Sequence, residues 1–202
     1  MTAVAETVAL DSRARLIAAA RELLWRNSYA TVSVDDLCRR AAVNKGSFYH
    51  HFPSKAELAT ATFDAMWVEL RPLFDAIFSP QVAPLERFAG YCAINEKVQT
   101  QKQQEYGCVV GCPFTNLASE VSTQDQALRQ LMVTKHERMC VYFVAAIRDG
   151  QADGSIPPGN PVVLAQQVQA FVTGVATQAR ILNEMTPFVD FERGIRRLLG
   201  VT

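Results

Sequence analysis

The sequence of 202 residues has few of the features that mark enzymes and membrane proteins. It has only three histidines, two of them adjacent at positions 50 and 51, and no glycine-rich phosphate loop or constellation of nucleophile, base and orienting acid. Its longest apolar runs, such as 141–147, are far too short to cross a bilayer. Residues 1–12 have no basic segment followed by an apolar one, so we expect no secretory signal, a cytoplasmic protein and no membrane partner.

The cysteines are few and do not form a disulfide pattern. There are five, an odd number at irregular spacing, in a chain that is 49% hydrophobic and can bury its own core, so reduced thiols are expected. Pro113 is typical of a first helical turn and would place Cys112 at a helix N-terminus, where the dipole favours a thiolate. Cys108 and Cys112 are therefore possible sensor thiols, and the alternative is that both are buried and inert. A metal site joining them to His136 and Cys140 is disfavoured by the loop around Cys108, so we predict no metal and no cofactor.

The most informative stretch is 31–55, TVSVDDLCRRAAVNKGSFYHHFPSK. Ser33 and Asp36 have the spacing of a capping box, which predicts a helix that begins directly after Ser33. Asn44 is a favoured N-cap residue and begins a second helical run, which ends before Pro53. The sequence therefore predicts two short helices separated by an abrupt turn.

Two helices joined in this way are typical of a helix-turn-helix, whose second helix enters the major groove of DNA by its N-terminal residues. Phe48 and Phe52 lie one turn apart and can anchor the second helix, which leaves Lys45 and Tyr49 facing outward. Gly46 allows a phosphate or base edge to come close to the backbone. The alternative is a buried helical hairpin whose polar residues are merely solvated. The expected DNA contacts are Thr31, Ser33, Asn44, Lys45, Gly46, Ser47, Tyr49, His50 and Lys55.

The run from Ser33 to Phe52, together with Lys55 and Leu58, resembles the signature of tetracycline-repressor-like (TetR) transcriptional regulators. This resemblance covers about residues 13–60. Ala42 departs from it, because the family usually has glycine in the turn. We expect Ala42 to adopt a less left-handed backbone than glycine would.

The resemblance implies an all-α fold with two parts. The first is a three-helix N-terminal head with the helix-turn-helix, residues 12–55, and the second is a larger helical ligand-binding and dimerisation body, residues 56–202. The charge distribution agrees with a DNA-binding head, because residues 13–55 hold eight Arg or Lys and three acids. The net +5 of that segment leaves −5 for the rest of a neutral chain.

Apolar periodicity predicts further helices on either side of the helix-turn-helix. Pro72 predicts a kink or break near Arg71 in the helix predicted over 54–78. Asp149-Gly150 predicts the end of the helix predicted over 123–149. The predicted ranges are 12–27, 54–78, 85–104, a helix from Pro113, 123–149, 162–185 and a final helix after Pro187.

The body offers candidates for two kinds of binding. Its apolar and aromatic side chains favour an uncharged or weakly polar ligand. The last two helices are apolar enough to be either ordinary core or a dimer seam, and the resemblance favours a seam. The expected ligand contacts are Trp67, Tyr91, Asn95, His136, Phe143 and Gln178. The expected dimer contacts are Phe171, Val175, Phe191, Ile195 and Leu198.

These observations predict a homodimeric, ligand-responsive transcriptional regulator that is not an enzyme. We expect a repressor that binds a palindromic double-stranded DNA operator and is released by a small-molecule effector. One alternative is a cysteine-based redox or electrophile sensor of the same fold. Another is a helical enzyme fused to a DNA-binding head, which the missing catalytic constellation disfavours.

Overall fold

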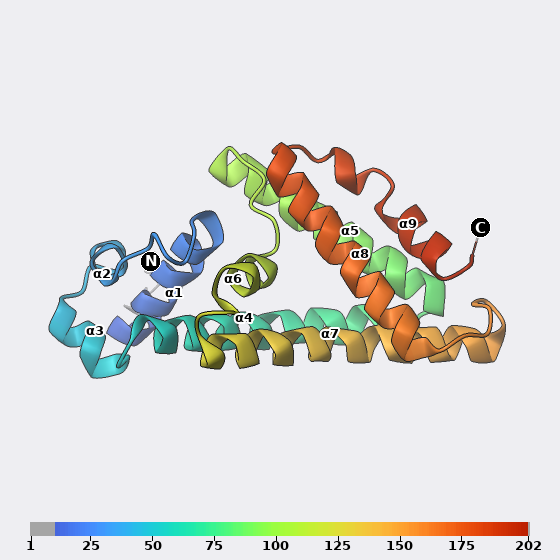
Figure 1. Ribbon diagram of the computed structural model, residues 1–202, viewed down its shortest axis with the longest axis horizontal. Coiled ribbons are helices and arrows are strands. Elements are labelled where there is room, and N and C mark those ends of the chain that lie inside the picture. The colour runs from blue at the N-terminus through green and yellow to red at the C-terminus, as the bar shows by residue number, and fades with distance from the viewer. Residues whose placement is uncertain (1–10, 202) are drawn as a thin grey trace, which may run out of the picture. The chain divides into compact units, whose positions relative to one another are not determined.

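The computed structural model describes residues 11–201, and every regular element in that range is helical (Figure 1). This confirms the predicted all-α class. Within the same range no helix is long and apolar enough to cross a membrane. The expectation that residues 1–12 carry no secretory signal falls mostly outside the described residues. The elements are α1 (Ser12–Arg26), α2 (Val34–Ala41), α3 (Lys45–His51), α4 (Lys55–Ile77), α5 (Pro84–Tyr106), α6 (Pro113–Val121), α7 (Gln126–Asp153), α8 (Pro161–Leu182), the 3-10 turn η1 (Thr186–Phe188) and α9 (Phe191–Leu198).

The chain divides into two compact units, one ending at Ala65 and the other beginning at Met66. We call the described residues of the first unit the head and those of the second the body. Helix α4 contributes its first half to the head and its second half to the body. The domain boundary expected from the sequence, between residues 55 and 56, lies at the start of this helix.

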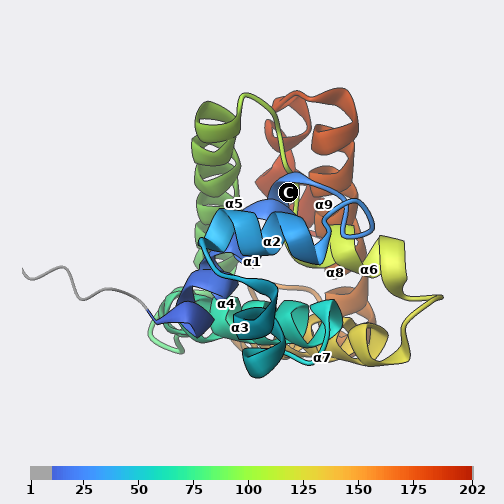
Figure 2. The ribbon, with the colours of Figure 1, turned by 90° about the vertical axis from the view of Figure 1, so that its left-hand side faces the viewer.

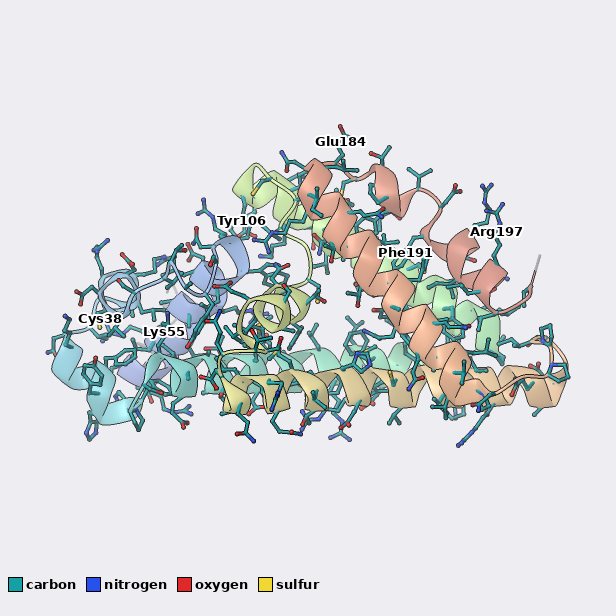
Figure 3. The ribbon with its side chains drawn as sticks, viewed as in Figure 1. Cys38, Lys55, Tyr106, Glu184, Phe191 and Arg197 are labelled. Carbon is teal, nitrogen blue, oxygen red and sulfur yellow. The ribbon has the colours of Figure 1, made fainter. Side chains whose placement is uncertain are left out.

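In the head, α1, α2 and α3 pack against one another around a small apolar core. Helix α1 begins after Asp11, whose carboxylate accepts a hydrogen bond of 2.7 Å from the backbone N–H of Ala14. The start of α4 is fastened to the loop between α1 and α2 by Lys55 (Figure 3), whose Nζ donates to the carbonyls of Tyr29 and Val32 at 2.8 and 3.0 Å. The buried apolar side chains are Leu16, Ala19, Ala20, Leu24, Val32, Leu37, Cys38, Ala41, Phe48, Phe52, Leu58, Ala59 and Phe63.

Helix α4 continues through Pro72, so the predicted break near Arg71 is wrong, whereas the alternative of a kink there stays a prediction. A proline inside a helix loses one backbone hydrogen bond and crowds the preceding turn. The turn that follows this proline is held by packing instead, because Phe74 and Phe78 both lie against the ring of Tyr91, with centroids 6.2 and 6.0 Å away. Tertiary contacts therefore keep this segment helical.

Helix α7 also extends beyond its predicted end at Asp149-Gly150 and stops at Asp153. Gly150 serves close packing rather than chain reversal, because a Cβ atom at this position would lie 2.6 Å from Cδ1 of Ile156. The stop is made by Gly154, which has the left-handed backbone (φ 83°) that glycine adopts at low cost.

Aromatic rings from different helices meet in the core of the body, among a larger number of aliphatic side chains. Tyr91 of α5 lies edge-on to Phe143 of α7 at 5.2 Å between centroids, and Phe78, directly after α4, lies 5.7 Å from Phe143. Figure 2 shows α5 standing beside α8 and α9, which complete this core. Arg87 is buried at its edge, where Nη1 donates to the carboxylate of Asp149 at 2.6 Å. The body thus joins helices that are far apart in the sequence.

Candidate nucleic-acid interface

The start of α2 is fixed by the capping box predicted from the sequence, and both halves of the box are present. The backbone N–H of Asp36 donates to the Ser33 hydroxyl at 3.1 Å, and the backbone N–H of Ser33 donates to the Asp36 carboxylate at 3.0 Å. Hydrogen bonds from the Ser33 hydroxyl and N–H hold the pKa of Asp36 below its usual range. The first helix of the helix-turn-helix therefore starts at a defined residue.

The turn after α2 differs from the expectation, because Ala42 is fully left-handed, with φ 52° and ψ 49°. A left-handed backbone costs a residue with a Cβ about 1–2 kcal/mol. Two hydrogen bonds hold it in place. The N–H of Val43 donates to the carbonyl of Cys38 at 3.0 Å, and Nη1 of Arg15 donates to the carbonyl of Ala42 at 3.1 Å. The hydrogen bonds that close the turn therefore offset the cost of a left-handed backbone at alanine.

Helix α3 is short and is held by one buried ring. Asn44 caps it by accepting a hydrogen bond from the N–H of Ser47 at 2.7 Å. Phe48 is fully buried in the head, while Tyr49, edge-on to the Phe48 ring at 5.1 Å, is 54% exposed. The side chains of Lys45 and His50 are also exposed. One side of α3 is thus core, and its other side presents a cation, an imidazole and a phenol to solvent.

The remaining expected DNA contacts take part in hydrogen bonds within the head. The hydroxyl of Thr31 donates to the carbonyl of Ser28 at 2.9 Å, and the Ser33 hydroxyl belongs to the capping box. Lys55 donates to two backbone carbonyls, as described above. Gly46 is exposed, and a Cβ at this position would lie 3.3 Å from the capping oxygen of Asn44. A side chain there would therefore press on the cap.

Ion pairs surround the helix-turn-helix. Nζ of Lys45 lies 2.8 Å from the carboxylate of Asp35, and this hydrogen bond raises the pKa of the Lys45 ammonium. Nη2 of Arg39 lies 3.1 Å from Asp36, and Arg40 pairs with Glu22 of α1. In each of these pairs, a carboxylate of the head offsets the charge of one basic side chain.

Two contacts of α1, one with the last residue of α3 and one with the residue directly after it, were not predicted. The hydroxyl of Ser12 and Nε2 of His51 lie 2.6 Å apart, although 39 positions separate them. The guanidinium of Arg13 lies 5.3 Å from the centroid of the Phe52 ring. Neither pair has a signal in the local sequence. A hollow of about 580 Å³ in the head was also not predicted, and it is lined by Leu23, Asn27, Thr31, Val32, Asp36, Arg39 and Arg40.

Comparison with known proteins identifies the family. The profile of "Bacterial regulatory proteins, tetR family" matches residues 16–62, and that of "Tetracyclin repressor-like, C-terminal domain" matches residues 84–195. The chain belongs to the TetR family. It is therefore a DNA-binding transcriptional regulator, as the sequence predicted, and TetR-family proteins are regulators rather than enzymes.

Individual relatives are similar over almost the whole chain. Transcriptional regulator AcuR of Cereibacter sphaeroides is 28% identical over 184 residues, which cover 90% of this chain and 82% of that protein. The HTH-type transcriptional repressor NemR of Escherichia coli K12 is 25% identical over 193 residues, or 94% of each chain. A crystal structure of a regulatory protein TetR from Rhodobacter sphaeroides is 26% identical, with a TM-score of 0.80 over 93% of this chain and 98% of that one.

In this TetR-family body, three of the expected ligand contacts belong to one aromatic cluster. The Trp67 and Tyr91 rings both lie near Phe74, at 5.9 and 6.2 Å between centroids, and Tyr91 contacts Phe143. Asn95, one turn after Tyr91 on α5, donates to the Tyr91 carbonyl at 2.7 Å. Burial raises the pKa of the Tyr91 phenol far above its usual range, so this hydroxyl stays protonated.

The other two expected ligand contacts lie apart from this cluster on exposed surface. Gln178 is exposed on α8, and His136 is exposed on α7, with Nε2 at 3.6 Å from Sγ of Cys140. The alternative metal site is not assembled. Over residues 11–201, no group of three or more His, Cys, Asp or Glu side chains is placed to hold a metal ion.

Cys112 occupies the helix N-terminus that was predicted for it, directly before Pro113 at the start of α6. It is half-buried and packs against the aromatic core, whereas Cys108 is half-buried in the preceding loop. The other three thiols lie in less reactive surroundings. Burial raises the pKa of Cys92 to about 12, and burial also raises the pKa values of Cys38 and Cys140.

Amide side chains hold the loop that carries these two cysteines. Gln99 is buried, and its Nε2 donates to the Gly111 carbonyl at 3.0 Å while its Oε1 accepts from the Gly111 N–H at 3.1 Å. At the other end of the loop, the N–H of Val109 donates to Oδ1 of Asn183, the residue that ends α8, at 2.8 Å. The cysteine loop is thus fastened to both α5 and α8.

The expected dimer contacts divide into two groups. Phe191, Ile195 and Val175 are buried inside the subunit, and Phe191, the first residue of α9 (Figure 3), has its ring centroid 6.1 Å from that of Phe171 on α8. Phe171 and Leu198 are half-buried. The most exposed apolar side chains at the end of α8 and beyond it were not predicted, and they are Ile181 (75% exposed), Leu182 (56%) and Val189 (79%).

Proposed function

We propose that this chain is a homodimeric, cytoplasmic repressor that reads a palindromic operator with α3 and leaves it when a small molecule binds the body. The observation that carries this proposal is the two-sided character of α3. Phe48 anchors one side of the helix, and the other side exposes Lys45, Tyr49 and His50 beside an exposed Gly46. An ammonium at the start of such a helix suits guanine or phosphate, and a phenol one turn later suits a phosphate or a thymine methyl group.

The remaining expected contacts take supporting roles in this proposal. Asn44 and Ser33 preserve the caps that aim the two helices, and Lys55 holds the loop before α2. Thr31 and Ser47 contribute at most one phosphate hydrogen bond each. Contacts with phosphates position the head, and contacts with base edges select the sequence.

The effector would bind near the cluster of Trp67, Tyr91 and Phe143 in the body. Rings and a protonated phenol suit an uncharged or weakly polar ligand that has an aromatic or apolar portion. Asn95 offers an amide to orient the ligand beside Tyr91. The ligand releases DNA only if it binds better to a dimer whose heads are wrongly spaced for the operator.

The dimer would form through the outer face of α8 and the segment that follows it. Ile181, Leu182 and Val189 are unusually exposed for large apolar side chains, and a two-fold contact would cover them. A Cβ atom added at Gly174 on the same helix would meet no atom within 4 Å, so the subunit itself does not require a small residue there. Two heads in such a dimer must reach half-sites about 34 Å apart, or a multiple of that distance.

The test is operator binding by Lys45→Ala and Tyr49→Ala, measured by fluorescence anisotropy on a duplex that the wild type selects from a random pool. Each variant should bind about tenfold or more weakly, and the salt slope of Lys45→Ala should fall by about 0.9 if the lost contact is a phosphate. Lys97→Ala, which removes an exposed lysine from the body, is the matched control and should bind normally. Equal affinity and equal salt slope for all three variants would refute the assignment of α3.

A second candidate, a thiol-based sensor, is favoured by the attachment of the cysteine loop to α8 through Asn183. Added bulk at Cys108 would strain that loop and could displace α8, the proposed dimer helix. Alkylation with iodoacetamide followed by mass spectrometry, run beside a DNA-release assay on Cys108→Ser and Cys112→Ser, tests this candidate. Slow alkylation at both positions, with release by a small molecule intact in both variants, would leave the ordinary ligand site as the sensor.

A further inference from the structure

The pair formed by Lys45 and Asp35 is unusual in its position. Lys45 is the first residue of α3, and Asp35 lies in the first turn of α2. Their side chains are 62% and 58% exposed, yet Nζ and the carboxylate oxygen are 2.8 Å apart. The carboxylate of Asp35 therefore lies beside the end of α3 that is proposed to contact DNA, although DNA is itself a polyanion.

Asp35 is not needed to cap α2. Asp36 completes the capping box with Ser33 and also pairs with Arg39. The helix dipole favours an acid in the first turn, but Asp36 already supplies one. A free acid beside DNA would repel phosphates, so Asp35 costs binding energy unless its contact with Lys45 has a use.

The donor geometry of lysine suggests that use. An ammonium has three N–H donors, and the one that Asp35 occupies leaves two. Two donors match the O6 and N7 acceptors of a guanine in the major groove. An ammonium held by a carboxylate is also partly neutralised, so it gains less from phosphates, which are present on every duplex.

We propose that Asp35 is a specificity-determining residue, which holds Lys45 toward a guanine edge and away from the phosphate backbone. This inference rests on the proposed function of α3 and deepens it. The pair is kept in the operator complex, where Lys45 donates to guanine and to Asp35 together. On random DNA a guanine stands at the required position only by chance, and the held ammonium cannot turn to a phosphate without leaving its carboxylate.

The variant Asp35→Asn tests the proposal, because asparagine keeps the shape but not the charge. Two duplexes are used: the palindrome that the wild type selects, and a random-sequence pool of the same length. For Asp35→Asn, affinity for the random pool should rise about threefold to fivefold, the scale of an exposed ion pair. Its salt slope should steepen by about 0.9 as Lys45 gains a phosphate. Affinity for the palindrome should fall about threefold or more, and sequences selected by the variant should lose one fixed guanine in each half-site.

Two controls separate the pair from a general effect of charge. Glu57→Gln removes an equal charge from an exposed position at the start of α4, where the backbone N–H of Glu57 donates to the Ser54 hydroxyl at 3.1 Å, a bond that glutamine keeps. This control should leave both affinities unchanged. In a Lys45→Ala background, Asp35→Asn removes only a repulsive charge, so the affinities for the two duplexes should rise by the same factor and the preference for the palindrome should not change. If Glu57→Gln lowers the preference for the palindrome as much as Asp35→Asn does, or if Asp35→Asn still lowers that preference without Lys45, then the pair does not set the specificity and the proposal fails.

The outcomes also separate this inference from the proposed function. If the wild type selects no palindrome, the proposed function itself fails. If the wild type selects a palindrome and Lys45→Ala weakens its binding, but Asp35→Asn selects the same sequence with the same affinities, only the role of Asp35 is refuted. Thermal melting of Asp35→Asn should match that of the wild type, because Ser33 and Asp36 still cap α2.

Discussion

In the head, residues three or four positions apart fix the direction of the chain, whereas in the body rings from different helices meet across long stretches of sequence. Ser33 and Asp36 cap α2, and Asn44 and Ser47 cap α3. In the body, Tyr91 meets Phe143, and Phe171 lies against Phe191 with centroids 6.1 Å apart. Local polar contacts thus shape the unit that reads DNA, and long-range apolar packing shapes the unit proposed to bind the effector.

This difference suggests a division of labour. A reading head must present the same side chains in the same directions each time, and hydrogen bonds to backbone groups have the directionality for that purpose. A body that responds to a ligand needs a core that can exist in two arrangements, and ring packing lacks fixed hydrogen-bond partners. Substitutions in the two units should therefore differ in size and in kind.

The largest effect is expected for Phe143→Ala in the body. Phe143 is fully buried, so the substitution should lower the free energy of unfolding by about 3–5 kcal/mol through lost transfer energy and a new cavity. Urea denaturation followed by circular dichroism measures this change. Val141→Ala on the same helix is the control, because Val141 is 67% exposed and its loss should cost about 0.5 kcal/mol or less. Similar losses in both variants would mean that α7 does not anchor the core.

The next effect concerns Ile181→Glu, which separates the surface of α8 from the core of the body. Ile181 is 75% exposed in the subunit, so the subunit should keep its helical content while the proposed dimer dissociates at least tenfold more readily. Analytical ultracentrifugation measures the association. Ile195→Glu is the contrasting variant, because Ile195 is fully buried and a charge there should unfold the body. Unchanged association of Ile181→Glu would place the dimer contact elsewhere.

In the head, Ser33→Ala should lower the free energy of unfolding by about 1 kcal/mol, the usual cost of a lost N-cap. That loss is smaller than the one expected for Phe143→Ala, as local capping implies. Ser33→Thr should restore most of the stability, since threonine also caps helices. A loss as large as that of Phe143→Ala would show that the cap controls more than the start of α2.

The same variant should change how stability depends on pH. Hydrogen bonds from Ser33 lower the pKa of Asp36 in the folded protein, so the ionised carboxylate stabilises the fold above its unfolded pKa, near 3.8. That contribution is lost as the pH falls through the lowered folded pKa. The difference in stability between wild type and Ser33→Ala should therefore be largest well above pH 3.8 and should shrink in stronger acid. Melting temperatures measured from pH 2 to pH 6 would test this, and a constant difference would contradict it.

The smallest effect, and the only stabilising one, is expected for Ala42→Gly in the turn. Glycine accepts the left-handed backbone of this position (φ 52°) without the steric cost, but it adds freedom to the unfolded chain, so the net gain should be about 0.5–1 kcal/mol. Ala41→Gly, one residue earlier at the end of α2, should instead lower stability by about 1 kcal/mol. Thermal melting compares the two. If both substitutions changed the stability in the same direction, Ala42 would not be strained.

The predictable parts of the molecule are those encoded by neighbouring residues. The capping box at Ser33, the cap at Asn44 and the helix N-terminus at Cys112 were all found where the sequence predicted them. The failures at Pro72 and Gly150 share one cause, which is packing against residues outside the helix. Pro72 does not break α4, and Gly150 does not end α7, because rings and side chains from other segments stabilise the helix at those places.

The sequence by itself determined the fold class, the helix-turn-helix with its caps, and the resemblance that comparison confirmed, because each depends on spacing within a few residues. Only the tertiary structure decided which apolar side chains of α8 and α9 are core and which are surface. It also decided that Ala42 is left-handed and that Asp35 meets Lys45. The physical reason is the same in each case. Helical periodicity gives a residue its face on a helix, but whether that face is covered, strained or paired depends on the segments that fold against it.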